Sequence, residues 1–214
     1  MSLIVNEIFY SLDGEGSRAG YPAIFIRLAG CNLRCNYCDT VYALHRNDGQ
    51  EMTVAEIVKR VKGYGKCRNI TLTGGEPLLQ EEAIDLLKAL HPDFDVVVET
   101  NGAVDIEKAL PYASICMDWK APSCGMNERM LESNLSKLRP GDCLKIVVKA
   151  ADLPYTGVFL SERIFPCPVY LSPVYGEITL STLAEFVKGY QGANNLRMQI
   201  QLHKTIWNPE ERGV

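Results

Sequence analysis

The chain has 214 residues, a formal net charge of −4 and a sequence pI near 5.5. This acidic balance disfavours a general nucleic-acid or anionic-membrane surface. A hydrophobic content of 47% with 22% charged residues is typical of a globular protein, and we expect one domain spanning residues 1–214. The N-terminus lacks signal-peptide features and no apolar run approaches the roughly 18 residues that cross a bilayer, so we expect a cytoplasmic protein.

Eight stretches rich in Val, Ile and Phe predict β-strands. Several of them are almost continuously apolar, as expected for strands that are buried on both faces of a parallel sheet. They cover residues 3–9, 23–29, 69–74, 95–100, 114–119, 143–149, 168–173 and 196–202.

Four amphipathic patterns between these strands predict helices. The first begins with a capping box, Thr53 and Glu56, and the second ends before Pro92, which cannot continue a helix. In the fourth, Thr182 and Glu185 predict a second capping box. The patterns cover residues 53–65, 80–90, 127–138 and 182–192.

The alternation of strands and helices predicts an α/β fold whose parallel sheet is open or curled into a partial barrel. Chemistry is expected at the carboxyl ends of such strands. Four polar or glycine-rich motifs stand there in consecutive units: CNLRCNYC, TGGEP, ETNG and DWKAP. We therefore expect one site, built at this edge of the sheet.

Three cysteines lie within eight positions, at Cys31, Cys35 and Cys38, with Tyr37 before the last. Clustered thiols in a cytosolic chain more often bind metal than form disulfides. A closed zinc site needs four ligands, and one of the other cysteines could supply the fourth. An iron–sulfur cluster held by only three thiolates keeps one iron open for reaction. No role follows from the sequence for Cys67, Cys116, Cys124, Cys143 and Cys167.

The triplet, its aromatic neighbour and TGGEP at 73–77 together resemble the radical S-adenosylmethionine (SAM) superfamily. That resemblance implies a partial, modified (β/α) barrel of mostly parallel strands. It also implies a 4Fe-4S cluster on the three thiolates, with SAM on the fourth iron. Cleavage of SAM then gives a 5′-deoxyadenosyl radical.

Three further segments, FYSLDGEGSRAGYPAIF, DWKAPSCGM and QIQLHKTIW, extend the resemblance over the whole chain. They are similar to the 7-carboxy-7-deazaguanine synthase family, which serves queuosine biosynthesis. The resemblance implies a carbon–nitrogen lyase that converts 6-carboxy-5,6,7,8-tetrahydropterin with loss of ammonia and regenerates SAM. It also implies Mg²⁺, a flavodoxin or ferredoxin as electron donor, and a homodimer, with no nucleic acid or membrane partner.

The resemblance assigns roles to matching positions, and no protein residue is expected to be catalytic beyond the cluster and SAM. Thr40 would be the protein ligand to Mg²⁺. The SAM site would comprise Tyr37, Cys38, Asp39, Gly74, Gly75, Glu76, Glu99, Asp118, Trp119, Lys120, Ser172 and Pro173. The substrate site would comprise Leu12, Asp13, Gly14, Glu15, Arg27, Thr73 and His203.

Other interpretations of three of these residues stay open. Arg27 lies in an apolar run and could form a structural ion pair, although its guanidinium fork also suits a carboxylate of the substrate. A lone histidine such as His203 is more often structural than functional. The family usually has Gln where this chain has Asp13, so only backbone contacts carry over there.

Two other functions are open from sequence. A small activase that installs a glycyl radical on a partner protein shares the cysteine triplet, but SLDGEG and DWKAP fit it poorly. A non-catalytic metal-binding module would hold zinc and leave SAM intact.

Overall fold

A computed structural model describes all residues 1–214 as a nine-stranded sheet with helices packed on it. The strand order is β3-β1-β2-β4-β5-β6-β7-β8-β9; neighbours from β2 to β9 are parallel, and β1 is antiparallel to β2 and β3. The strands are β1 (Ser2–Leu12), β2 (Pro22–Leu28), β3 (Gln50–Thr53), β4 (Asn69–Gly74), β5 (Asp95–Thr100), β6 (Ser114–Lys120), β7 (Cys143–Val148), β8 (Val169–Pro173) and β9 (Leu196–Met198).

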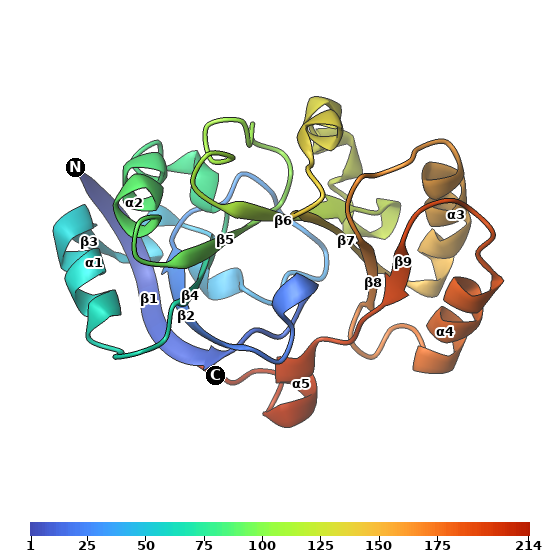
Figure 1. The fold of residues 1–214 in the computed structure, drawn as a ribbon. Coiled ribbons are helices and arrows are strands. Elements are labelled where there is room, and N and C mark those ends of the chain that lie inside the picture. The colour runs from blue at the N-terminus through green and yellow to red at the C-terminus, as the bar shows by residue number, and fades with distance from the viewer.

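The sheet curls into an open barrel whose two ends do not meet (Figure 1). Four of the helices cover its outer surface, while α5 and the chain end lie on the open side. The helices are α1 (Val54–Lys62), α2 (Ala83–Leu90), α3 (Leu153–Ser161), α4 (Leu180–Gly189) and α5 (Leu202–Ile206). The predicted α/β partial barrel of mostly parallel strands is confirmed.

The two faces of the curled sheet differ in chemistry. Successive side chains of a strand point to opposite faces, so Met117 and Trp119 on β6 join the apolar core beneath the helices. Cys116, Asp118 and Lys120 point to the inner face and line a cavity. The sheet therefore presents an apolar outer face for folding and a polar inner face for chemistry.

The predicted helix over 127–138 is wrong. The chain forms short 3-10 turns at Asn127–Arg129 and Glu132–Lys137 instead. Asn134, which is fully buried, donates to the carbonyls of Gly102 and Val104 and accepts from the backbone N–H of Ile106. An asparagine that ties down a neighbouring loop in this way competes with helical hydrogen bonding.

The last predicted strand is also too long. After β9 the chain leaves the sheet at Gln199, whose side-chain amide donates to the carbonyl of Gly16 and accepts from its N–H, at 2.9 and 2.7 Å. These two hydrogen bonds hold the chain away from the sheet, and the helix α5 follows. His203 therefore lies in a helix and does not end a strand.

Besides α5, two elements were not predicted, β3 and α3. The helix α3 contains Pro154 and Gly157, and its buried face carries the polar Thr156 beside Phe159 and Leu160 while the apolar Val158 is exposed, so its sequence shows no apolar stripe. None of the five helices combines the length and the apolar character needed to cross a membrane.

The helix α4 starts earlier than its sequence pattern indicates, and this gives a testable difference. Thr179 is the N-cap, and its hydroxyl accepts from the backbone N–H of Thr182 at 3.1 Å. We expect Thr179→Ala to lower the free energy of unfolding by about 1 kcal/mol, because a helix N–H loses its acceptor. Thr182→Ala should cost less than about 0.5 kcal/mol. Chemical denaturation of both variants would contradict the assignment if the order were reversed.

Candidate active site

A cavity of about 320 Å³ opens at the carboxyl ends of the parallel strands. Its walls come from the loop after β1, the inner face of the sheet, the cysteine loop, α5 and the chain end. The four motifs that stand at strand ends in the sequence therefore contribute to one site.

The cysteine loop places all three thiols of the triplet at this cavity. Backbone hydrogen bonds from Gly30 and Cys31 to residues 43–44 fix its start. The Sγ atom of Cys31 accepts from the N–H of Leu33 at 3.4 Å and from Nδ2 of Asn101 at 3.7 Å. Burial raises the pKa of Cys31 and of Cys38, so these thiols need a bound metal to become thiolates.

The geometry of the triplet fits an iron–sulfur cluster better than a single ion. No three Cys, His, Asp or Glu side chains converge on one point, as a zinc ion requires. A four-iron cluster takes each thiolate on a different iron, so its ligands stand apart around it. Three thiols around an open cavity are such an arrangement.

The TGGEP turn supports the cysteine loop from behind. A Cβ atom on Gly75 would lie 2.4 Å from the carbonyl oxygen of Gly30 and 2.8 Å from Cβ of Cys31, so only glycine fits there. Gly74 and Gly75 line the cavity through their backbone. Glu76 does not reach it.

Glu76 is fully buried behind the turn. Its carboxylate accepts from the N–H groups of Leu78 and Asn101, at 3.0 and 2.7 Å, and from the Thr100 hydroxyl at 3.0 Å. Burial raises the pKa of Glu76 to about 7. Its side chain therefore joins the ends of β4 and β5, which places the turn beside the cysteine loop.

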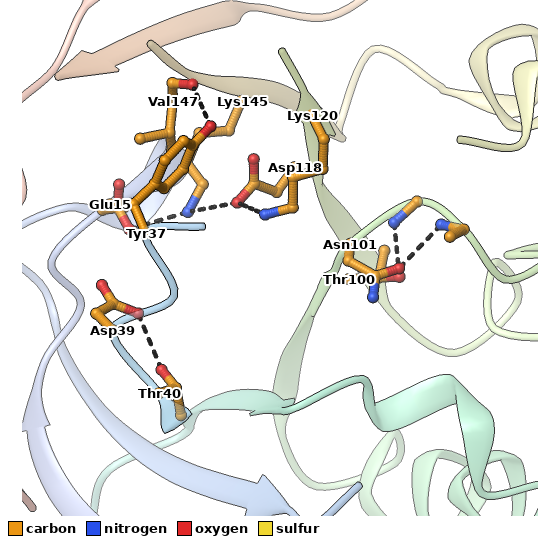
Figure 2. A network of polar contacts seen from close by, with 12 residues as sticks. Glu15, Tyr37, Asp39, Thr40, Thr100, Asn101, Asp118, Lys120, Lys145 and Val147 are labelled. Carbon is orange, nitrogen blue, oxygen red and sulfur yellow. Dashed lines mark hydrogen bonds and ion pairs between the residues drawn. The ribbon is translucent and has the colours of Figure 1, made fainter. Parts of the chain in front are cut away.

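Acids and lysines alternate along the inner face of the sheet, as Figure 2 shows. Nζ of Lys145 lies 2.9 Å from Glu15 and 3.7 Å from Asp118, and Nζ of Lys120 lies 2.8 Å from Asp118. Burial works to lower the pKa of both lysines, but the carboxylates beside them outweigh it and hold the pKa above its ordinary value. Both lysines are therefore charged.

Arg27 lies on the cavity wall and is also paired. Its Nε donates to Glu7 at 2.8 Å, and its guanidinium lies 5.9 Å from the ring centre of Phe9 and 5.6 Å from that of Tyr42. The structural ion pair left open by the sequence is thus present. The terminal guanidinium nitrogens make no hydrogen bond to the protein, so the fork can still bind an anion.

A polar group lies where α5 meets the cysteine loop. The Thr40 hydroxyl donates to Oδ1 of Asp39 at 3.0 Å, and Nζ of Lys204 lies 2.7 Å from Oδ2 (Figure 2 shows Asp39 and Thr40). His203 covers Gly14 so closely that a Cβ there would lie 2.7 Å from its Nδ1. Burial lowers the pKa of His203 in spite of nearby acids, so its imidazole is neutral near pH 7.

Several residues of the expected site turn away from the cavity. The indole of Trp119 stacks on Phe159 at 5.1 Å in the outer core, because strand alternation places it opposite Asp118 and Lys120. Asp13 points down to Arg18 at 3.1 Å and Thr71 at 2.7 Å. Ser172 and Pro173 are buried and are not on the cavity wall. The other expected residues line it: Gly14, Glu15, Leu12, Arg27, Tyr37, Cys38, Asp39, Thr40, Thr73, Gly74, Gly75, Glu99, Asp118, Lys120 and His203.

Comparison with known proteins decides the family. The sequence profile of the Radical SAM superfamily matches residues 25–119. A 7-carboxy-7-deazaguanine synthase from Clostridium acetobutylicum is 42% identical, and the match covers 100% of both chains. The chain belongs to the 7-carboxy-7-deazaguanine synthase family.

Other members of the 7-carboxy-7-deazaguanine synthase family agree with this assignment. Those from Chlorobaculum tepidum and Methanospirillum hungatei are 38% and 41% identical, covering 99% and 96% of this chain and 97% and 86% of their own. The crystal structure of QueE from Escherichia coli superposes with a TM-score of 0.74 at 23% identity, covering 94% of each chain, which supports the fold. The family resemblance found in the sequence is confirmed.

Part of the cavity wall was not predicted from the sequence. Lys145 stands in the apolar run CLKIVV, a signal as clear as that of Arg27. Lys204 is next to His203, and Asn101 is next to the Thr100 that holds Glu76. The chain end, residues 209–214, also lines the cavity, and no local pattern predicts it.

The buried carboxyl of Asp13 gives a pH-dependent prediction. Burial raises its pKa from 3.8 to about 6, although Arg18 opposes this. The folded protein therefore holds a proton that the unfolded chain releases, so this contribution to stability is present below pH 3.8 and lost as pH rises through about 6. As pH rises through this range, Asp13 should lower the free energy of unfolding of the wild type by at most about 3 kcal/mol. Asp13→Asn has no carboxyl at this position, so it should not show this decrease.

Denaturation of the wild type and of Asp13→Asn at several pH values between 4 and 7 measures this decline. The stability difference between the two proteins should shrink or change sign as pH rises. Parallel curves would show that Asp13 does not titrate as the geometry indicates.

Proposed function

We propose that this chain is a carbon–nitrogen lyase that converts 6-carboxy-5,6,7,8-tetrahydropterin to 7-carboxy-7-deazaguanine with loss of ammonia. The observation that carries the proposal is one cavity whose wall holds the three thiols together with the Glu15–Lys145 pair and the fork of Arg27. Full-length relatives with this name support the same reaction.

The three thiolates would hold a 4Fe-4S cluster, and the backbone of Gly74 and Gly75 would bind the amino group of SAM. When bound, the cluster and SAM supply a 5′-deoxyadenosyl radical that is regenerated as SAM in each turnover. Tyr37, whose hydroxyl donates to the carbonyl of Val147 at 3.1 Å, forms a fixed aromatic wall beside Asp39. Asp118 and Lys120 would contact the polar parts of SAM, and Glu99 faces the same cavity.

The substrate would lie between the loop after β1 and the cysteine loop. The backbone at Leu12 and Gly14 and the Glu15 carboxylate would bind the N–H groups of the pterin edge, since such donors need acceptors. Arg27 would bind the substrate carboxylate. Thr73 and His203 also line the cavity and would contact the ring.

We also propose Mg²⁺ beside Thr40, a flavodoxin or ferredoxin as reductant, a homodimer and a cytoplasmic location. Thr40 offers a hydroxyl oxygen, a donor type that Mg²⁺ accepts, and the substrate and water would complete the shell. Eight free cysteines suit a reducing compartment.

Anaerobic turnover tests the proposal. The protein is loaded with iron and sulfide, mixed with SAM, Mg²⁺, a reductant and 6-carboxytetrahydropterin, and followed by mass spectrometry. We expect 7-carboxy-7-deazaguanine and ammonia in equal amounts. SAM cleavage without the deazapurine would remove this substrate and favour the activase.

A further inference from the structure

Lys145 is a buried cation on the wall of the cavity. It lies in β7, whose six residues are all buried, and is itself 7% exposed. Strand alternation turns its side chain to the inner face, where it lines the cavity. A lysine is rarely buried unless it is paired, so its partners indicate its role.

The distances show which partner depends on Lys145. Asp118 has a closer cation in Lys120, at 2.8 Å against 3.7 Å to Lys145. Glu15 lies 2.9 Å from Lys145, and its next contact is the neutral amide of Gln201 at 3.4 Å. Lys145 is therefore the cation that balances Glu15, although 130 positions separate them in sequence.

Only one oxygen of the Glu15 carboxylate accepts hydrogen bonds from the protein. Oε2 is bound by Lys145 and Gln201, whereas Oε1 is buried and has no hydrogen-bond partner. A buried carboxylate oxygen without a donor costs free energy, which a ligand with N–H groups recovers. The side-chain position of Glu15 at the cavity wall suits such a ligand.

We propose that Lys145 is a positioning residue for substrate recognition. It fixes the Glu15 carboxylate so that Oε1 accepts N–H bonds from the amino-substituted, guanidine-like edge of a pterin. This inference rests on the proposed function, because it assumes a pterin as the occupant. Lys145 was not among the expected site residues. As a counter-ion it explains how Glu15 stays on the same cavity wall as the acids Glu99 and Asp118.

The charge of the wall gives a second reason for a cation at this position. Glu15, Glu99 and Asp118 are three of the acids that line the cavity, and Lys120 is paired with Asp118. Loss of Lys145 leaves Glu15 buried without a counter-ion, so its side chain would turn toward water and away from the ligand.

Ligand binding by the wild type and five variants tests the inference. Dissociation constants for 6-carboxytetrahydropterin and, separately, for SAM are measured anaerobically on cluster-loaded protein. Lys145→Met should weaken pterin binding by about 10- to 100-fold, as expected when one partner of a buried ion pair is removed. SAM binding should change by less than about threefold, since Lys120 still holds Asp118. Lys145→Arg should recover part of the loss.

A double-mutant cycle separates positioning from general damage. Glu15→Gln alone should weaken pterin binding, and Lys145→Met added to Glu15→Gln should weaken it no further. This pair leaves no unbalanced charge, so it stays informative if Lys145→Met alone does not fold. Lys188→Met, which removes an exposed lysine paired with Glu185 at 2.8 Å, is the control and should bind as wild type does.

The outcomes are distinct. If the wild type binds and converts the pterin but the two losses add, or Lys145→Met binds normally, the positioning role is overturned and the proposed function stands. A cluster-loaded wild type that does not bind the pterin overturns both.

Discussion

Replacement of Cys38 by alanine is expected to abolish SAM cleavage, with a loss of more than about a hundredfold in activity. Mutation of residues that only hydrogen-bond to metal ligands already lowers activity by up to that factor, and loss of a ligand should lower it further. Cys38 is the best choice of the triplet. Cys35 has the thiol of Cys124 within hydrogen-bond reach, and this neighbour could replace a lost thiolate. Acid-labile sulfide and 5′-deoxyadenosine would be measured on the reconstituted variant.

Cys67→Ala is the matched control. The Cys67 thiol lies 3.6 Å from the carbonyl oxygens of Pro22 and Asn69 and is not on the cavity wall. This variant should load its cluster and cleave SAM as the wild type does. Normal cleavage by Cys38→Ala would overturn the assignment of the triplet as cluster ligands.

The second large effect is expected at Gly75. In Gly75→Ala the new methyl group would meet the carbonyl oxygens of Gly30 and Ala43 at 2.4 and 2.7 Å, and backbone atoms cannot move aside as a flexible side chain does. We expect the free energy of unfolding to fall by about 1–3 kcal/mol. Because Gly30 precedes Cys31, cluster loading should fall as well.

Gly141→Ala serves as the control, since a Cβ at Gly141 meets nothing within 4 Å. Its stability should stay within about 0.5 kcal/mol of wild type. Denaturation curves and iron content of the two variants would be compared. Equal stability and equal iron content would show that the contact between the TGGEP turn and the cysteine loop is not needed.

Much of the barrel could be predicted because its strands are continuous apolar runs. The same property hid most of the inner face, since in a run such as CLKIVV only the charged Lys145 marks a side chain that points inward. Trp119 illustrates the difficulty. A motif places it in the site, yet strand alternation sends its indole to Phe159 in the core.

The parts of the site that could not be predicted depend on long-range pairing. Lys145 with Glu15 and Lys204 with Asp39 join residues that no local pattern connects. The position of His203 depends on Gln199, which turns the chain out of the sheet by binding Gly16. The cysteine triplet, by contrast, could be predicted to share one cavity because its three thiols lie within one loop.

The proposed reaction is tested most directly by the molar ratio of 7-carboxy-7-deazaguanine to 5′-deoxyadenosine in a single anaerobic reaction. A chain that regenerates SAM should give many product molecules for each deoxyadenosine released, with one ammonia per product. A ratio near one would show that SAM is consumed. Deoxyadenosine without any deazapurine, from protein with an intact cluster, would contradict the proposed conversion to 7-carboxy-7-deazaguanine.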